Sequence, residues 1–196
     1  MLDTDKGQFH VQGTPEIALT WQDLAKSEIE AGRKLEETVT FEGSQPTYPN
    51  GAYIAVVEVD LETGHVKVRQ LITCDDAGRI INPLIAEGQV HGGVSQGIAQ
   101  ALYEELRYDE DGNPLTSTFA DYLIVSACEV PSFEGTFQET LSDRNELGVK
   151  GIGESGSIGS TPAVVNAVID ALSEFGIRHI DMPLSPERVW RAINCD

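Results

Sequence analysis

Three consecutive stretches decide how this chain folds: AYIAVVEV (52–59), DLETG (60–64) and VKVRQLIT (66–73). The first and third are rich in β-branched residues and alternate between apolar and polar positions, which is the pattern of a half-buried strand. The stretch between them has a turn composition, and Gly64 can adopt the positive φ that such a turn requires. The sequence therefore predicts a β-hairpin here.

Helical periodicity follows the hairpin. Apolar residues recur at a spacing of three or four over 85–107, which predicts one long helix. A second helix is expected to have Ser160 or Thr161 as its cap and Pro162 in its first turn, and to run to a left-handed stop at Gly176. A last helix is expected to begin at the stretch SPE (185–187).

The remaining segments are less regular. Residues 1–44 are predicted to be an N-terminal leader with one helix, which Thr20 caps, Asp23 supports at its third position and Gly32 ends. Residues 41–51 form a predicted loop, and 115–147 hold at most two strands. Because strands and helices do not alternate regularly, the predicted fold class is α+β.

Composition excludes several classes of partner. Lys and Arg total 13 against 32 Asp and Glu, a net charge of −19, which argues against binding to nucleic acid or to an anionic membrane surface. No apolar run approaches the roughly 20 residues of a membrane span. Three widely spaced cysteines suit a reducing, cytoplasmic location, and the four histidines lack metal-ligand spacing, so we expect no metal held by side chains.

A glycine-rich stretch, GVKGIGESGSIG (148–159), is the first candidate for chemistry. It contains the pattern GxGxxG at 151–156, but the polar residues before it do not form the buried strand that a dinucleotide site needs. Glu154 lies inside the pattern, where a carboxylate would repel a pyrophosphate, so this residue is instead a candidate general base. The alternative is a surface turn with a solvated glutamate.

The predicted helix over 85–107 is the second candidate. It contains four glycines, and a helical period places Gln89, Gly93, Gln96 and Gln100 on one face, where amide groups could bind a polar cofactor. The alternative is a solvated face with glycines for tight helix packing. The pair Asp75-Asp76 is read either as two paired carboxylates or as a polar turn with Arg79 as a local partner.

Three stretches together resemble a known family: DAGRIINP (76–83), EGQVHGGVSQGI (87–98) and LGVKGIGESG (147–156). They are similar to the C-terminal part of the molybdopterin-binding large subunit of the xanthine dehydrogenase / aldehyde oxidase family, and especially to aerobic carbon monoxide dehydrogenase large subunits. The resemblance is good over 45–194 and loose over 1–44. It implies that 45–196 is the C-terminal part of a molybdopterin-binding domain, a mixed sheet with packed helices.

The resemblance also implies roles for individual residues. Glu154 matches the catalytic base of the family, and Gln96, Gly153 and Gly93 match positions at the molybdopterin cofactor. The implied reaction oxidises a carbon centre with water as the oxygen source, and electrons leave through iron–sulfur clusters and FAD on partner subunits. Since the pterin would hold the molybdenum, missing metal-ligand spacing is expected.

Family large subunits are several times longer than this chain, so the resemblance implies a partner. That partner is the remaining part of the large subunit, and the isolated chain is expected to be inactive and to self-associate through apolar surface or to have mobile loops around 115–160. One alternative is a non-catalytic remnant that serves in assembly or binding. Another, less favoured, is a nucleotide-binding module that uses 151–156.

Overall fold

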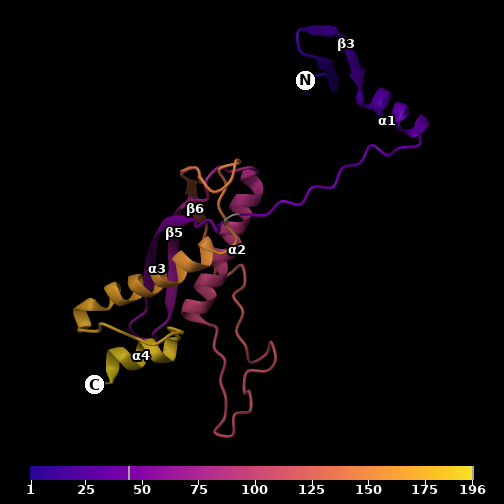
Figure 1. Cartoon of the computed structure of the whole chain (residues 1–196). Helices are drawn as coiled ribbons and strands as arrows, with labels where there is room; N and C mark the ends of the chain where they lie inside the picture. The colour runs from indigo at the N-terminus through magenta and orange to yellow at the C-terminus, as the bar shows by residue number, and fades with distance from the viewer. Residues whose placement is uncertain (44, 196) are drawn as a thin grey trace. The chain divides into compact units, whose positions relative to one another are not determined.

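The computed structural model describes residues 1–43 and 45–195. It divides into two compact units, Met1–Glu42 and Gly43–Asp196, which are treated separately below (Figure 1).

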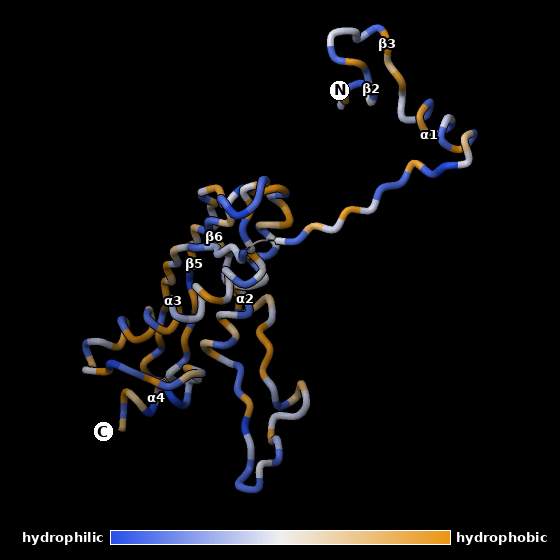
Figure 2. Tube along the Cα trace, in the orientation of Figure 1, coloured by the Kyte–Doolittle hydropathy of each residue, from blue (hydrophilic) through white to orange (hydrophobic). Residues whose placement is uncertain are grey.

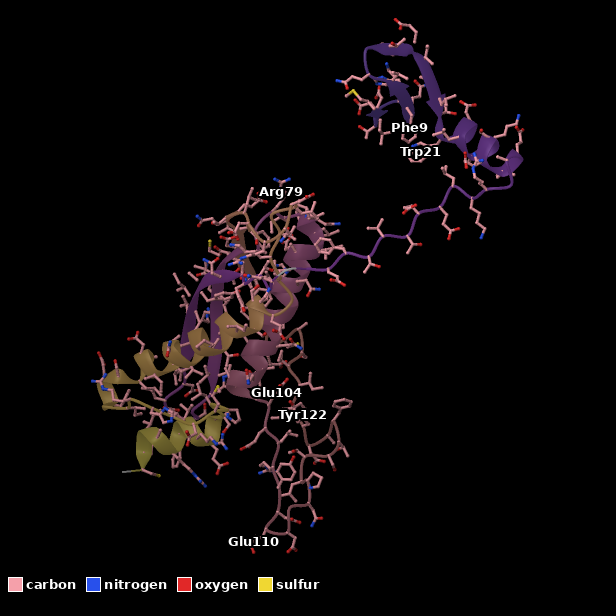
Figure 3. The ribbon with its side chains drawn as sticks, viewed as in Figure 1. Phe9, Trp21, Arg79, Glu104, Glu110 and Tyr122 are labelled. Carbon is pink, nitrogen blue, oxygen red and sulfur yellow. The ribbon has the colours of Figure 1, made fainter. Side chains whose placement is uncertain are left out.

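The smaller unit is a three-stranded antiparallel sheet followed by one helix. Its strands are β1 (Leu2–Asp3), β2 (Gln8–Val11) and β3 (Thr14–Thr20), in that order, and its helix is α1 (Trp21–Glu30). The predicted cap is confirmed, because the Thr20 hydroxyl accepts from the Asp23 amide at 3.1 Å and the Asp23 carboxylate accepts from the Thr20 amide at 3.0 Å. The sequence predicted the helix but not the strands, whose packing includes an edge-to-face contact between Phe9 and Trp21 (Figure 3).

The larger unit is built on a mixed sheet. Strands β4 (Asn50–Val59) and β5 (Val66–Asp76) form the predicted antiparallel hairpin, and Gly64 has the expected positive φ of 74°. Strand β6 (Phe133–Phe137) pairs in parallel with β5, which gives the order β4-β5-β6. Antiparallel and parallel pairing in one sheet with packed helices confirms the α+β class.

Helices α2 (Pro83–Leu102) and α3 (Ser155–Ala171) pack on each other and on the sheet (Figure 1). Helix α2 begins at the cap Asn82, whose side chain accepts from the Ile85 amide, and it ends five residues before the predicted end at position 107. Together with α4 (Pro186–Asn194), these elements bury one apolar core, whose largest fully buried apolar side chains are Leu71, Val94, Ile98, Val164, Val168, Leu172, Leu184 and Val189.

The prediction for the start of α3 was wrong. The helix begins at Ser155, so Pro162 lies inside it and Ser160 is not its cap. The Ser160 hydroxyl instead donates to the Gly156 carbonyl at 2.6 Å, one turn earlier in the same helix. The end of this helix also differs from the prediction, because α3 stops at Ala171 and a separate short 3-10 helix, Ser173–Phe175, follows it. The predicted left-handed stop at Gly176 is confirmed, with a φ of 78°, and α4 begins after its Ser185 cap as expected.

A long arm joins α2 to β6. It turns at Asp109, whose carboxylate accepts from the Asn113 amide at 2.8 Å. The tip of the arm is strongly polar (Figure 2). At its base, the Tyr122 hydroxyl donates to Glu104 at 2.9 Å (Figure 3). Of the two strands allowed in 115–147, the structure contains only β6 among these described residues.

The close packing of α2 against α3 at glycine residues can be tested by substitution with alanine. A Cβ built on Gly93 would lie 2.9 Å from the Gly156 Cα and from the Ser157 nitrogen, so backbone would have to move. We expect Gly93→Ala to lower the free energy of unfolding by about 1–3 kcal/mol. Gly92→Ala is the matched control, because nothing lies within 4 Å of its Cβ position, and it should raise stability by up to about 1 kcal/mol. Equal effects in urea unfolding would contradict this account.

Candidate functional site

The structure brings the three stretches that carry the resemblance into one region. Gly78 forms an isolated antiparallel bridge with Val149. Around it, the Arg79 amide donates to the Gly148 carbonyl at 3.0 Å, and the Lys150 amide donates to the Ala77 carbonyl at 2.8 Å. The stretch 87–98 lies on α2, which contacts the start of α3 through Gly93. Segments up to 80 residues apart therefore surround the glycine-rich loop.

A buried ion pair fixes the approach to that loop. The Lys150 ammonium lies 3.1 Å from the Asp76 carboxylate, and the two side chains are only 13% and 8% exposed. The same carboxylate accepts from the Gly78 amide at 2.9 Å and from the Thr140 amide at 3.1 Å. Burial alone would raise the pKa of Asp76, but hydrogen bonds from Thr140 and Gly78, together with Lys150, hold it well below its ordinary value.

This arrangement corrects the reading of Asp75-Asp76. Asp76 pairs with Lys150 and not with Arg79, which is exposed (Figure 3). Asp75 is fully buried and accepts from the Tyr53 hydroxyl at 2.5 Å, while its other carboxylate oxygen has no partner among the described residues. Neighbouring strand residues point to opposite faces, so the two carboxylates have separate partners and do not form a paired site.

Glu154 occupies the position immediately before α3. Its side chain is exposed and makes no cap hydrogen bond, while its carbonyl accepts from the Ile158 amide and so starts the helix. Since the fold does not use this carboxylate, it remains accessible for chemistry.

The loop before Glu154 is open. Nothing lies within 4 Å of a Cβ position on Gly151, and on Gly153 the nearest atom is the Gln89 side-chain oxygen at 3.8 Å. The amides of residues 151–154 donate to no backbone carbonyl of the described chain. Unpaired amide donors beside a glutamine side chain can bind a polar or anionic group, so the donor set fits the pterin and phosphate parts of a molybdopterin.

The predicted cofactor residues fall into two groups. Gln96 is exposed on α2, as is Gln89, which lies one heptad earlier and next to Gly153. Gly93 is buried against α3, so its described contact is with Gly156. The sequence had placed Gln89 on the polar face of this helix, but only the fold shows that it meets the loop of Glu154.

An apolar pocket of about 350 Å³ lies beside the loop. It is lined mainly by apolar side chains, among them Ile81, Ile85, Leu147 and Ile152. Of these, Ile81 and Ile85 are 65% and 60% exposed.

Other classes of site find little support in the described residues. No strand runs into the GxGxxG pattern, because β6 ends at Phe137 and only the bridge at Val149 intervenes before α3. Within the described chain, no three His, Cys, Asp or Glu side chains gather as metal ligands. The helices that the structure describes are all too short or too polar to cross a bilayer.

Comparison with known proteins identifies the class. A family model described as "Molybdopterin cofactor-binding domain" matches residues 1–131, so the match includes the N-terminal unit, where the resemblance is loose. The chain belongs to this family. It is a part of the molybdopterin-binding domain found in large subunits of the xanthine dehydrogenase and carbon monoxide dehydrogenase type.

The names of the relatives indicate different substrates. The chain is 39% identical to the carbon monoxide dehydrogenase large chain of Afipia carboxidovorans over 97% of its own length and 24% of that protein. It is 47% identical to the nicotine 6-hydroxylase large subunit of Paenarthrobacter nicotinovorans over 81% of this chain and 19% of that protein. The structure of quinoline 2-oxidoreductase from Pseudomonas putida 86 matches with a TM-score of 0.87 at 36% identity, over 96% of this chain and 25% of that one. The chain thus spans between 19% and 25% of the length of these relatives.

Proposed function

We propose that this chain is a portion of a molybdenum hydroxylase large subunit, and that Glu154 is the general base when the remaining part of the subunit is present. The observation that carries the proposal is the open loop at 151–154, which presents an exposed carboxylate beside unpaired amides and Gln89. When bound, the molybdenum cofactor supplies the redox chemistry at the substrate carbon.

The residues of this chain then have distinct tasks. Glu154 accepts the proton that the oxygen-donating water loses, which a carboxylate with no competing partner is able to do. Gln89 and Gln96, with the amides around Gly153, would hold the polar edge of the cofactor. The Asp76–Lys150 pair holds the loop that leads to the base.

The same proposal assigns partners. The exposed apolar side chains Ile81, Leu84 and Ile85 at the start of α2 lie where a further part of the subunit would cover them. Alone, the chain is expected to be inactive and to self-associate through this surface.

Iron–sulfur and flavin subunits would carry the electrons away, in the cytoplasm. The relatives' names point to different substrates, so the substrate is not assigned.

A co-purification experiment tests the proposal. The chain is expressed with the remaining three quarters of a related large subunit, and the molybdenum content of the purified complex is measured. We expect near-stoichiometric metal, and Gln89→Ala or Gln96→Ala should weaken cofactor retention about tenfold, the effect of one hydrogen bond of about 1.4 kcal/mol. Gln138→Ala, an exposed glutamine on another segment, serves as the control. A stable complex without molybdenum would instead support the non-catalytic assembly role.

A further inference from the structure

The pair formed by Tyr53 and Asp75 has no role in the proposed function, although it joins a half-buried tyrosine of β4 to a fully buried carboxylate of β5. Asp75 is 0% exposed, and one of its oxygens accepts from the Tyr53 hydroxyl at 2.5 Å. Its second oxygen has no partner among the described residues. A buried carboxylate that is only half satisfied costs stability, and such a group calls for an explanation beyond packing.

The Tyr53 ring lies between the sheet and α3. A Cβ built on Gly159 would overlap the Tyr53 ring, so the ring fills the space that this glycine leaves. Gly51, opposite Asp75 in the hairpin, is equally restricted, because its Cβ would lie 3.1 Å from the Asp75 carboxylate and 2.9 Å from the Cys74 carbonyl. Two glycines therefore leave room for one tyrosine in one orientation.

That orientation is fixed at both ends of the side chain. The Tyr53 backbone belongs to β4, where it pairs with Thr73, and its hydroxyl is held by Asp75 on β5. Burial, the hydrogen bond and the charge of Asp75 all raise the pKa of Tyr53, so the hydroxyl keeps its proton and remains a donor at any working pH.

The ring contacts α3 little more than one turn after Glu154. Three residues earlier, on a neighbouring part of the same helix surface, α3 rests on α2 through Gly156 against Gly93. The start of the helix is thus held by α2 and by the Tyr53 ring, and no side chain caps it. From this geometry we propose that Tyr53, anchored by Asp75, is a positioning residue that fixes the first turn of α3 and so places the Glu154 carboxylate.

This inference rests on the proposed role of Glu154, but its first test does not need a loaded enzyme. In the full 196-residue chain, Tyr53→Phe removes only the hydroxyl, and Asp75→Asn removes the anchoring charge while it keeps the side-chain shape. Amide hydrogen exchange should become about tenfold faster at residues 155–160 and stay unchanged at residues 164–171. Tyr48→Phe, at an exposed tyrosine, is the matched control and should change neither region.

A double-variant cycle separates positioning from plain packing. The effects of Tyr53→Phe and Asp75→Asn on exchange should not add, because both break the same contact. In the assembled enzyme, Tyr53→Phe should lower kcat about tenfold with KM and molybdenum content unchanged, and it should cause no further loss once Glu154→Gln is present.

Three results would overturn the positioning role of Tyr53. Faster exchange over all of α3 and α4 in Tyr53→Phe would show a general packing role and overturn the proposal, as would unchanged exchange at 155–160. An additive loss of kcat with Glu154→Gln would also overturn it, since Tyr53 would then act independently of that base. If Glu154→Gln leaves turnover unchanged, the proposed function fails, whereas a local change in exchange would still show the structural link between Tyr53 and the start of α3.

Discussion

Glu154→Gln is expected to lower kcat of the assembled enzyme about 10³-fold, within the range by which a positioned general base accelerates a reaction. The amide has the size of the carboxylate but cannot accept a proton. Because the Glu154 side chain is exposed and does not cap α3, its replacement should change the free energy of unfolding by less than about 0.5 kcal/mol. Loss of activity would therefore report chemistry and not misfolding.

A control variant separates this effect from a general loss of surface charge. Glu174→Gln changes an exposed glutamate in the 3-10 helix after α3 and should leave kcat as it was. Residual activity of Glu154→Gln above a tenth of the original would remove Glu154 from the role of base.

Local sequence patterns predicted the elements whose stabilising contacts are close in sequence. The hairpin needs alternating residues and a Gly64 turn, and the caps at Thr20 and Ser185 act on amides three residues later. These signals lie within a few positions of each other, so a single sequence is sufficient to read them.

The start of α3 was missed because tertiary packing overrides a local rule. Proline is common in a first turn, so Pro162 suggested a helix that begins near it. The helix starts seven residues before this proline because Gly156 must lie against α2. The Thr161 hydroxyl then lies within hydrogen-bond distance of two acceptors, the Ser157 carbonyl at 3.1 Å and the Gln100 side-chain oxygen on α2 at 3.0 Å.

The same distinction between local sequence signals and tertiary contacts applies to the candidate site. Glu154 stood out in the sequence because five glycines surround it in a stretch of twelve residues, which is a local signal. The partner of Asp76 was assigned to the nearby Arg79, but it is Lys150, 74 positions away. Neither this pair nor the approach of Gln89 to Gly153 has a signature in sequence spacing, because both depend on how α2, β5 and the loop meet.

Asp76→Asn is expected to lower the free energy of unfolding of the larger unit by about 3 kcal/mol at pH 7, the lower end for breaking a buried ion pair, because this one lies just below the surface. The variant leaves the Lys150 ammonium 13% exposed without its counterion and weakens the acceptor of the Gly78 and Thr140 amides. Asp143→Asn is the matched control. Its partner Arg144 lies 3.3 Å away in an exposed pair, so the loss should be under about 1 kcal/mol.

The pH dependence of this loss follows from the lowered pKa of Asp76. A carboxyl whose pKa is lower in the folded than in the unfolded chain stabilises the fold fully above its unfolded value, about 3.9, and loses that contribution as the pH falls through the folded value. In urea unfolding, the difference between the original chain and Asp76→Asn should be constant from pH 7 to 5 and shrink below about pH 4. The free energy of unfolding lost in Asp76→Asn could instead be the same at every pH, or no larger than the loss in Asp143→Asn. Either result would show that Asp76 acts through its shape and not through its charge. In that case the glycine-rich loop would be held by its backbone contacts to Ala77 and Arg79 alone.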